Sequence, residues 1–165
     1  MLATPTCDDA PMRAVVQRAD GARVVVGGNV VATFAGPGLV VLVGVTHSDT
    51  ADHARRLAAK VYDLRIFEPR HAKDPIVDDR RELSASELDL PVIVVSQFTL
   101  YGDARKGRRP TWTAAAPGPI AEPLVDEVVR ELRARGATVG TGIFGADMRV
   151  ELTNDGPNTL VLDID

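Results

Sequence analysis

The stretch GPGLVVLVGV at residues 36–45 decides the fold of this 165-residue chain. Within it, Leu39–Val45 is a continuous apolar run with no polar alternation, which is typical of a strand covered on both faces. The run is far too short to span a bilayer. We therefore expect Leu39–Val45 to be the central strand of a sheet.

Upstream of this run the sequence predicts an antiparallel meander of short strands. The segments are rich in β-branched residues, and Asp20-Gly21, Gly27-Gly28-Asn29 and Gly36-Pro37-Gly38 separate them. Glycine supplies the positive φ angles that tight hairpin turns require. The predicted strands of the meander are Arg13–Arg18, Ala22–Val26 and Val30–Phe34.

Downstream, helical and strand patterns alternate. Apolar residues at helical spacing predict one helix from about Thr50 to Leu64 and a second that ends at Gly136. The remaining predicted strands are Val92–Ser96, Met148–Leu152 and Thr159–Ile164, and the predicted irregular segments are Glu68–Leu90 and Gly102–Pro119. The sequence thus predicts the α/β class, with an N-terminal meander and two main helices in a compact single domain.

Composition limits the possible classes of protein. Hydrophobic residues make up 45% and charged residues 25% of the chain, which is ordinary for a globular domain. The single cysteine, Cys7, cannot form an internal disulfide, so we expect a reducing compartment, the cytoplasm. Residues 1–11 lack the features of a secretory signal, and we expect a disordered extension there and one domain over 12–165. The net charge of −4 restricts any nucleic-acid contact to a local patch.

Several familiar motifs are excluded by their context. The string from Gly140 to Gly145 matches the dinucleotide fingerprint, but a predicted strand follows it where a helix is required, which argues against a nucleotide-dependent oxidoreductase. The spacing of His47, His53 and His71 fits no zinc site, so we expect no metal and assign these residues to capping or exposed positions. No serine lies in a nucleophile elbow.

Two segments remain as candidate sites. Ser96, Gln97, Phe98 and Thr99 lie where a buried strand runs into a loop, the usual place to present polar groups and an aromatic face to a ligand. A basic loop follows directly and carries four cations in five residues, flanked by glycines. These cations, Arg105, Lys106, Arg108 and Arg109, predict a rim that contacts phosphates.

At these residues the chain resembles the D-aminoacyl-tRNA deacylases of the bacterial and eukaryotic type, over essentially all of Met12–Asp163. The segments that carry the resemblance are RAVVQR at 13–18, GPGLVVLVGVT at 36–46, LRIFE at 64–68, 96–110, FGADM at 144–148 and 154–159. The resemblance implies a compact α/β domain with mixed sheets in α/β/β layers, and a tight homodimer with no metal and no diffusible cofactor. It also implies hydrolysis of the ester between a D-amino acid, or glycine on the wrong tRNA, and the terminal adenosine, assisted by the 2′-hydroxyl of the tRNA.

The resemblance also implies roles for individual residues. Ser96–Thr99 match the pocket motif for the terminal adenosine and the aminoacyl group, with no covalent nucleophile. Phe144, Gly145, Ala146 and Met148 match the opposite wall. Gly156-Pro157 matches a cis dipeptide that enters the partner subunit's pocket and rejects L-amino acids.

The chain departs from the family pattern at two places. Asn158 stands where the family usually has valine, and Lys73–Leu90 matches the family poorly.

The other open interpretation is a non-catalytic dimeric module that binds tRNA. Both interpretations expect the acceptor end of tRNA as partner and no membrane or DNA.

Overall fold

The computed structural model describes residues 10–74, 76 and 81–165. The expected disordered extension therefore falls largely on residues 1–9, outside the described residues. The strands are β1 (Met12–Val26), β2 (Asn29–Gly44), β3 (Arg65–Phe67), β4 (Leu83–Ser84), β5 (Val92–Ser96), β6 (Val139–Thr141) and β7 (Met148–Ile164). The helices are α1 (Ala51–Asp63), α2 (Ala85–Leu88) and α3 (Gly118–Ala134), with 3₁₀ turns η2 (Pro69–His71) and η3 (Phe98–Tyr101).

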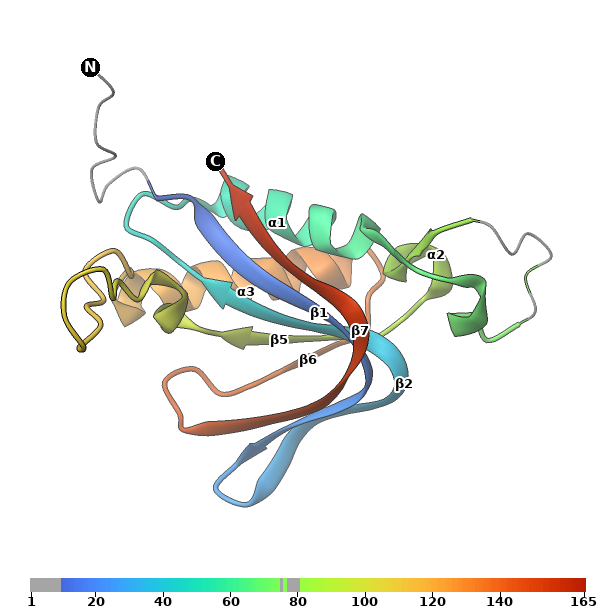
Figure 1. The fold of residues 1–165 in the computed structure, drawn as a ribbon. Coiled ribbons are helices and arrows are strands. Elements are labelled where there is room, and N and C mark those ends of the chain that lie inside the picture. The colour runs from blue at the N-terminus through green and yellow to red at the C-terminus, as the bar shows by residue number, and fades with distance from the viewer. Residues whose placement is uncertain (1–9, 75, 77–80) are drawn as a thin grey trace.

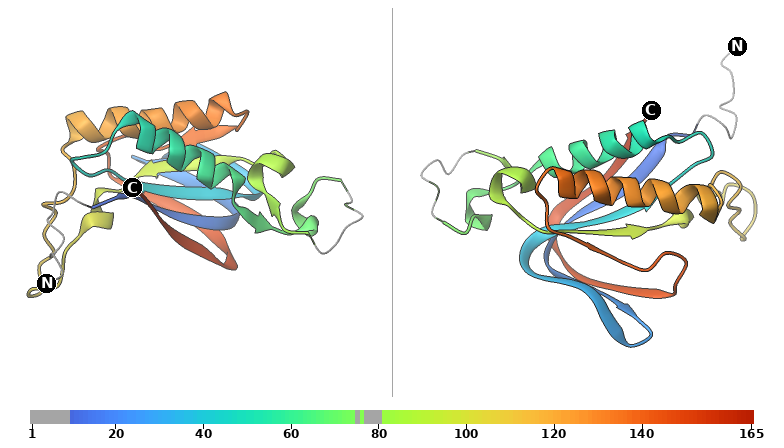
Figure 2. Two further views of the ribbon diagram at one scale, coloured as in Figure 1. Left: turned by 90° about the horizontal axis from the view of Figure 1, so that it is seen from above. Right: turned by 180° about the vertical axis from the view of Figure 1, so that it is seen from behind.

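One mixed sheet organises the fold, with the strand order β6-β5-β2-β1-β7 (Figure 1). β1 pairs antiparallel with β2 and β7, whereas β5 pairs parallel with β2 and β6. α1 and α3 lie side by side on one face of this sheet (Figure 2). The predicted α/β class with a mixed sheet is therefore confirmed.

The central strand is buried on both faces, as its continuous apolar run predicts. Leu39, Val41 and Val43 belong to the main core, which α1 and α3 cover. Between them, Val40 faces a second core that includes Ile93 of β5 and Val24 of β1. The curved lower parts of β1, β2 and β7 cover this second face (Figure 1), so the sheet itself supplies the third layer.

The predicted N-terminal meander is one long hairpin, because two of its three turns are irregularities within strands. β1 runs through Asp20-Gly21 and β2 runs through Gly36-Pro37-Gly38, and the pairing register shifts where the two segments face each other. A β-bulge of this kind bends a strand without ending it. Gly27-Gly28 does form the predicted turn, with φ of +56° and +83°.

The two predicted C-terminal strands are likewise one strand, β7. Asn154 pairs with Ala19 and Thr159 pairs with Gln17, so residues 155–158 face the single β1 residue Arg18. The segment between the two predicted strands, which contains Gly156-Pro157, is therefore a bulge in the middle of an edge strand.

Both predicted main helices are confirmed. Thr50 is the N-cap of α1, and His53 closes a capping box there. Gly136 follows the end of α3 with φ of +95°, a conformation that favours glycine. Within the irregular segment Glu68–Leu90 the structure adds η2, β4 and α2, and β4 pairs with β3 just before the segment. Residues 75 and 77–80 lie outside the described residues. No helix among the described residues is long and apolar enough to cross a membrane.

Candidate functional site

A pocket of about 190 Å³ lies where β2 and β5 end. α3 and the turn that follows β6 supply its other walls. The lining residues are Val43, Val45, Ser96, Gln97, Phe98, Ala116, Gly118, Ala121, Val125, Phe144 and Gly145. The pocket thus unites two motifs that are almost fifty residues apart in the sequence, Ser96-Gln97-Phe98 and Phe144-Gly145.

The exit of β5 is held by short contacts to β2. The backbone N–H of Gln97 donates to the carbonyl of Val43 at 2.7 Å. η3 then packs so closely that a Cβ at Gly44 would come within 2.9 Å of the Tyr101 ring. The Tyr101 hydroxyl donates to the Gly44 carbonyl at 3.2 Å, and burial raises its pKa above the ordinary value, which keeps it a donor. The Ser96–Phe98 segment is therefore placed rigidly at the pocket.

Three of the eight predicted pocket residues do not line the pocket. Thr99 is exposed on η3, where its hydroxyl accepts a hydrogen bond from the Gln97 side chain. Met148 instead packs against the second core, where its sulfur lies 2.3 Å from the position of a Cβ at Gly142. Ala146 lies between these two regions. In this chain the aromatic ring of Phe144 and the backbone at Gly145 form the wall that the FGADM motif supplies.

The structure also shows lining residues that the sequence did not indicate. Ala116, Gly118 and Ala121 close the pocket from the start of α3. The loop before this helix is tied to the end of β2, because the Ala116 N–H donates to Val45 at 2.9 Å and the Thr46 hydroxyl donates to Ala114 at 2.7 Å. Small residues at the helix start were the one available signal, and small size alone does not distinguish a pocket wall from a packing contact.

The pocket holds hydroxyls without a general base. Among the described residues, neither Ser96 nor Thr99 hydrogen-bonds to a histidine or a carboxylate, and the nearby His47 ring is bonded to the Thr113 carbonyl at 2.8 Å. The described part of the chain also contains no group of three His, Cys, Asp or Glu side chains that could hold a metal ion. What the site offers is a largely apolar cavity with polar groups at its mouth, suited to positioning a ligand.

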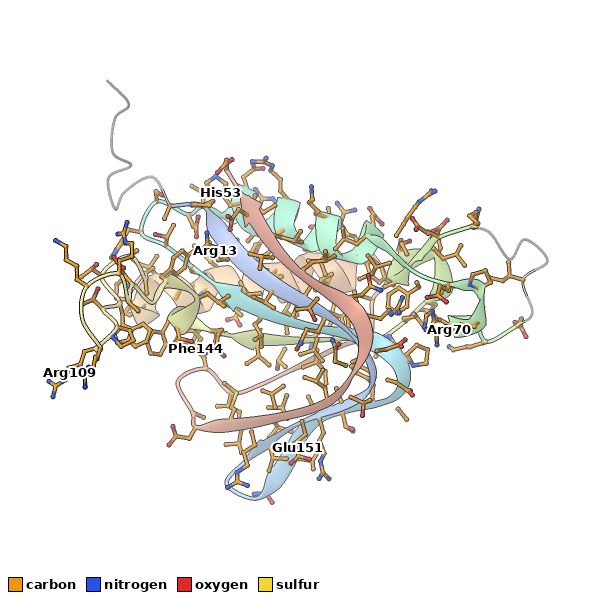
Figure 3. The ribbon with its side chains drawn as sticks, in the orientation of Figure 1. Arg13, His53, Arg70, Arg109, Phe144 and Glu151 are labelled. Carbon is orange, nitrogen blue, oxygen red and sulfur yellow. The ribbon has the colours of Figure 1, made fainter. Side chains whose placement is uncertain are left out.

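The basic loop carries its own counter-ion. Asp103 accepts from the Arg105 guanidinium at 2.6 and 2.9 Å, and these hydrogen bonds lower the pKa of Asp103 to about 2. Lys106, Arg108 and Arg109 are exposed, and Figure 3 shows Arg109 projecting from the loop at the same end of the molecule as Phe144. Paired backbone hydrogen bonds between Asp103 and Thr111 close the base of this loop.

Gly156-Pro157 lies far from the pocket of its own chain. Ser96 of β5 pairs with Val43 of β2, which in turn pairs with Ala14 of β1. The bulge in β7 lies opposite Arg18, four residues further along β1, and β7 is three strand spacings from β5. That separation amounts to roughly 14 Å across the sheet and about 13 Å along it. The bulge and the pocket of one chain therefore do not form a single site.

Comparison with known proteins gives one consistent family. The family model described as D-Tyr-tRNA(Tyr) deacylase matches residues 15–163. A Streptomyces coelicolor protein named D-aminoacyl-tRNA deacylase is 61% identical over 153 residues, which cover 93% of this chain and 100% of that protein.

Solved structures agree with this comparison. One described as c-Myc DNA Unwinding Element Binding Protein has a TM-score of 0.81 at 33% identity and covers 93% of this chain and 99% of its own. Another, described as a "probable eukaryotic D-amino acid tRNA deacylase", has a TM-score of 0.78 at 20% identity with the same coverage, which supports the fold alone. The chain is therefore a member of the D-Tyr-tRNA(Tyr) deacylase family.

Proposed function

We propose that this chain is an editing hydrolase that cleaves the ester between a D-amino acid and the terminal adenosine of tRNA, releasing the D-amino acid and free tRNA. Glycine on the wrong tRNA is a second substrate, and the enzyme acts in the cytoplasm. The observation that carries the proposal is the pocket in which Ser96-Gln97-Phe98 meets Phe144-Gly145. The family membership supports the same reaction.

The protein contributes positioning and no covalent nucleophile. Among the residues that the structure describes, no histidine or carboxylate hydrogen-bonds to Ser96 or Thr99, which supports a mechanism in which neither hydroxyl attacks the ester. When the amino acid is esterified to the 3′-oxygen of the terminal ribose, the free 2′-hydroxyl lies on the adjacent ribose carbon, and in this proposal it helps to activate the attacking water. The rigid pocket holds the ester, the 2′-hydroxyl and the water in one geometry.

Chirality is selected by exclusion. In this proposal Gly156-Pro157 of one subunit enters the pocket of its partner, where backbone carbonyls occupy the space that an L side chain needs. A D-amino acid or glycine presents a hydrogen on that side and is accepted. The wide separation of bulge and pocket within one chain supports a homodimer in which each subunit completes the other's site.

Matched D- and L-aminoacyl-tRNAs test the proposed reaction. The chain is expected to accelerate loss of the ester from D-tyrosyl-tRNA and to leave L-tyrosyl-tRNA nearly untouched. Binding of both without hydrolysis would instead support the non-catalytic tRNA-binding module.

A heterodimer tests the shared site. Ser96→Phe blocks the pocket of its own subunit, and Gly156→Trp blocks the pocket of the partner, so each homodimer is expected to be inactive. Co-expression with two affinity tags yields a heterodimer in which one of two sites is intact, and we expect about half of the parental activity. An inactive heterodimer, or an active monomer in light scattering, contradicts the cross-subunit site.

The basic loop provides a further prediction. Arg108 and Arg109 are exposed and read charge, not base identity. Replacing both by alanine is expected to raise KM. The slope of log KM against the logarithm of the salt concentration is expected to fall by roughly 0.7–0.9 for each phosphate contact that is lost. The D-over-L preference stays unchanged. The matched control is the double variant Lys60→Ala with Arg130→Ala, which removes two exposed cations elsewhere on the surface. A change in chiral preference in the loop variant would instead assign the loop to the substrate pocket.

A further inference from the structure

A cluster of polar side chains lies beneath the bulge of β7, at the opposite end of the molecule from Phe144 (Figure 3). It combines residues from three elements that are distant in the sequence: Arg18 of β1, the segment 68–71 around η2, and Asp155 of β7. Arg18 and His71 are buried, with 2% and 7% of their surface exposed. Buried polar groups that bond to a bulge restrict how it can move.

Asp155, the residue directly before Gly156-Pro157, is the centre of this cluster. Its carboxylate accepts from the His71 ring at 2.8 Å and from Arg70 at 3.3 Å, and it forms an ion pair with Arg18 Nε at 3.2 Å. Its backbone carbonyl accepts from Arg18 Nε at 3.0 Å. These contacts, with the His71 hydrogen bond as the largest, lower the pKa of Asp155, so the carboxylate remains ionised.

The residue after the dipeptide faces the same guanidinium. With its amide oxygen oriented towards Arg18, Asn158 accepts from the two terminal nitrogens at 3.0 and 3.2 Å. Both flanks of Gly156-Pro157 are therefore tied to one buried arginine, whose Nη1 also donates to the Ile66 carbonyl at 2.6 Å.

The His71 ring has a defined orientation. The backbone N–H of Glu68 donates to Nδ1 at 2.8 Å, so Nδ1 carries a lone pair and Nε2 carries the proton. That proton is donated to Asp155. The Phe67 ring packs against the imidazole in an edge-to-face arrangement, with the two ring centroids 5.3 Å apart. His71 thus links the capping box of η2 to the bulge.

We propose that His71 is a positioning residue for chiral selection. It acts through Asp155, without touching substrate, and keeps the backbone of Gly156-Pro157 at the place from which it enters the partner's pocket. The proposal rests on the proposed function of that dipeptide. The hydrogen bond from His71 to Asp155 is called the clamp below.

Two substitutions separate the roles of the two ring nitrogens. His71→Asn keeps an oxygen near the position of Nδ1, which preserves the cap on Glu68, but it has no donor near Asp155. His71→Gln places an amide donor near the position of Nε2 and restores a contact to Asp155. His53→Asn is the matched control, because His53 accepts from the Thr50 N–H at 3.0 Å in the equivalent capping box of α1.

The expected result is a selective loss of discrimination. His71→Asn is expected to lower the D-over-L ratio of kcat/KM by about tenfold or more, the effect of one lost hydrogen bond to a charged group. Hydrolysis of D-aminoacyl-tRNA changes by less than about threefold, and His71→Gln retains most of the parental ratio. His53→Asn discriminates as the parent does.

Hydrogen exchange provides a measurement that does not depend on activity. Amides in a peptide covering 154–159 are expected to exchange faster in His71→Asn than in the parent, with no change in His53→Asn. If the parent hydrolyses no aminoacyl-tRNA, the proposed function fails while the exchange result still tests the clamp. If His71→Asn does not fold, Asp155→Ala removes the same contact and takes its place. Parental discrimination together with parental exchange in a folded variant overturns the proposal.

Discussion

A D-aminoacyl-tRNA that ends in 2′-deoxyadenosine is expected to be hydrolysed at least about a hundredfold more slowly than the normal substrate. In the part of the chain that the structure describes, no histidine or carboxylate hydrogen-bonds to Ser96 or Thr99, and the proposed function therefore assigns the proton of the attacking water to a group of the substrate. If the neighbouring 2′-hydroxyl supplies that function, its removal costs the usual contribution of general acid–base catalysis. Ester loss from the two substrates under single-turnover conditions measures the effect.

The matched controls separate enzyme chemistry from intrinsic reactivity. Each rate is divided by the spontaneous hydrolysis rate of the same ester, because the 2′-hydroxyl also affects the uncatalysed reaction. Thr99→Ala is expected to keep at least about a third of the parental rate, since this hydroxyl is exposed and does not line the pocket. A trapped acyl-enzyme, or loss of activity in Thr99→Ala with normal turnover of the deoxy substrate, would overturn this mechanism.

Pro157→Ala is expected to lower the D-over-L ratio of kcat/KM by about tenfold or more. Proline restricts φ, and alanine at the same position returns that freedom to a four-residue bulge opposite Arg18. The carbonyls to which the proposed function assigns the exclusion of an L side chain would then no longer hold one position. The ratio is measured with D- and L-tyrosyl-tRNA at equal concentrations.

Pro37→Ala is the matched control for this substitution. Gly36-Pro37 is a second Gly-Pro dipeptide, also at a register irregularity of the sheet, but it lies in β2 opposite Asp20. We expect this variant to discriminate as the parent does. A folded, dimeric Pro157→Ala protein with parental discrimination would show that the dipeptide does not select chirality.

Local patterns in the sequence were sufficient to predict several elements and part of the site. β5 has the predicted bounds, and α1 lies within the predicted range. Both signals for α1, its capping residue and the spacing of its apolar residues, come from residues that are close together in the chain. The run at Leu39–Val45 correctly indicated a strand buried on both faces. Ser96 and Gln97, predicted as site residues from their position at the end of a buried strand, line the pocket.

The tertiary structure decided the rest, because register and long-range contact have no local signature. Gly-containing segments at Asp20-Gly21 and Gly156-Pro157 have the composition of turns, yet pairing with β1, β2 or β7 continues on both sides of each and makes them bulges. The walls of the pocket around Ala121 come from a helix whose small residues resemble ordinary packing. His71 and Asp155 are 84 positions apart, and only the folded sheet brings the imidazole within 2.8 Å of the carboxylate.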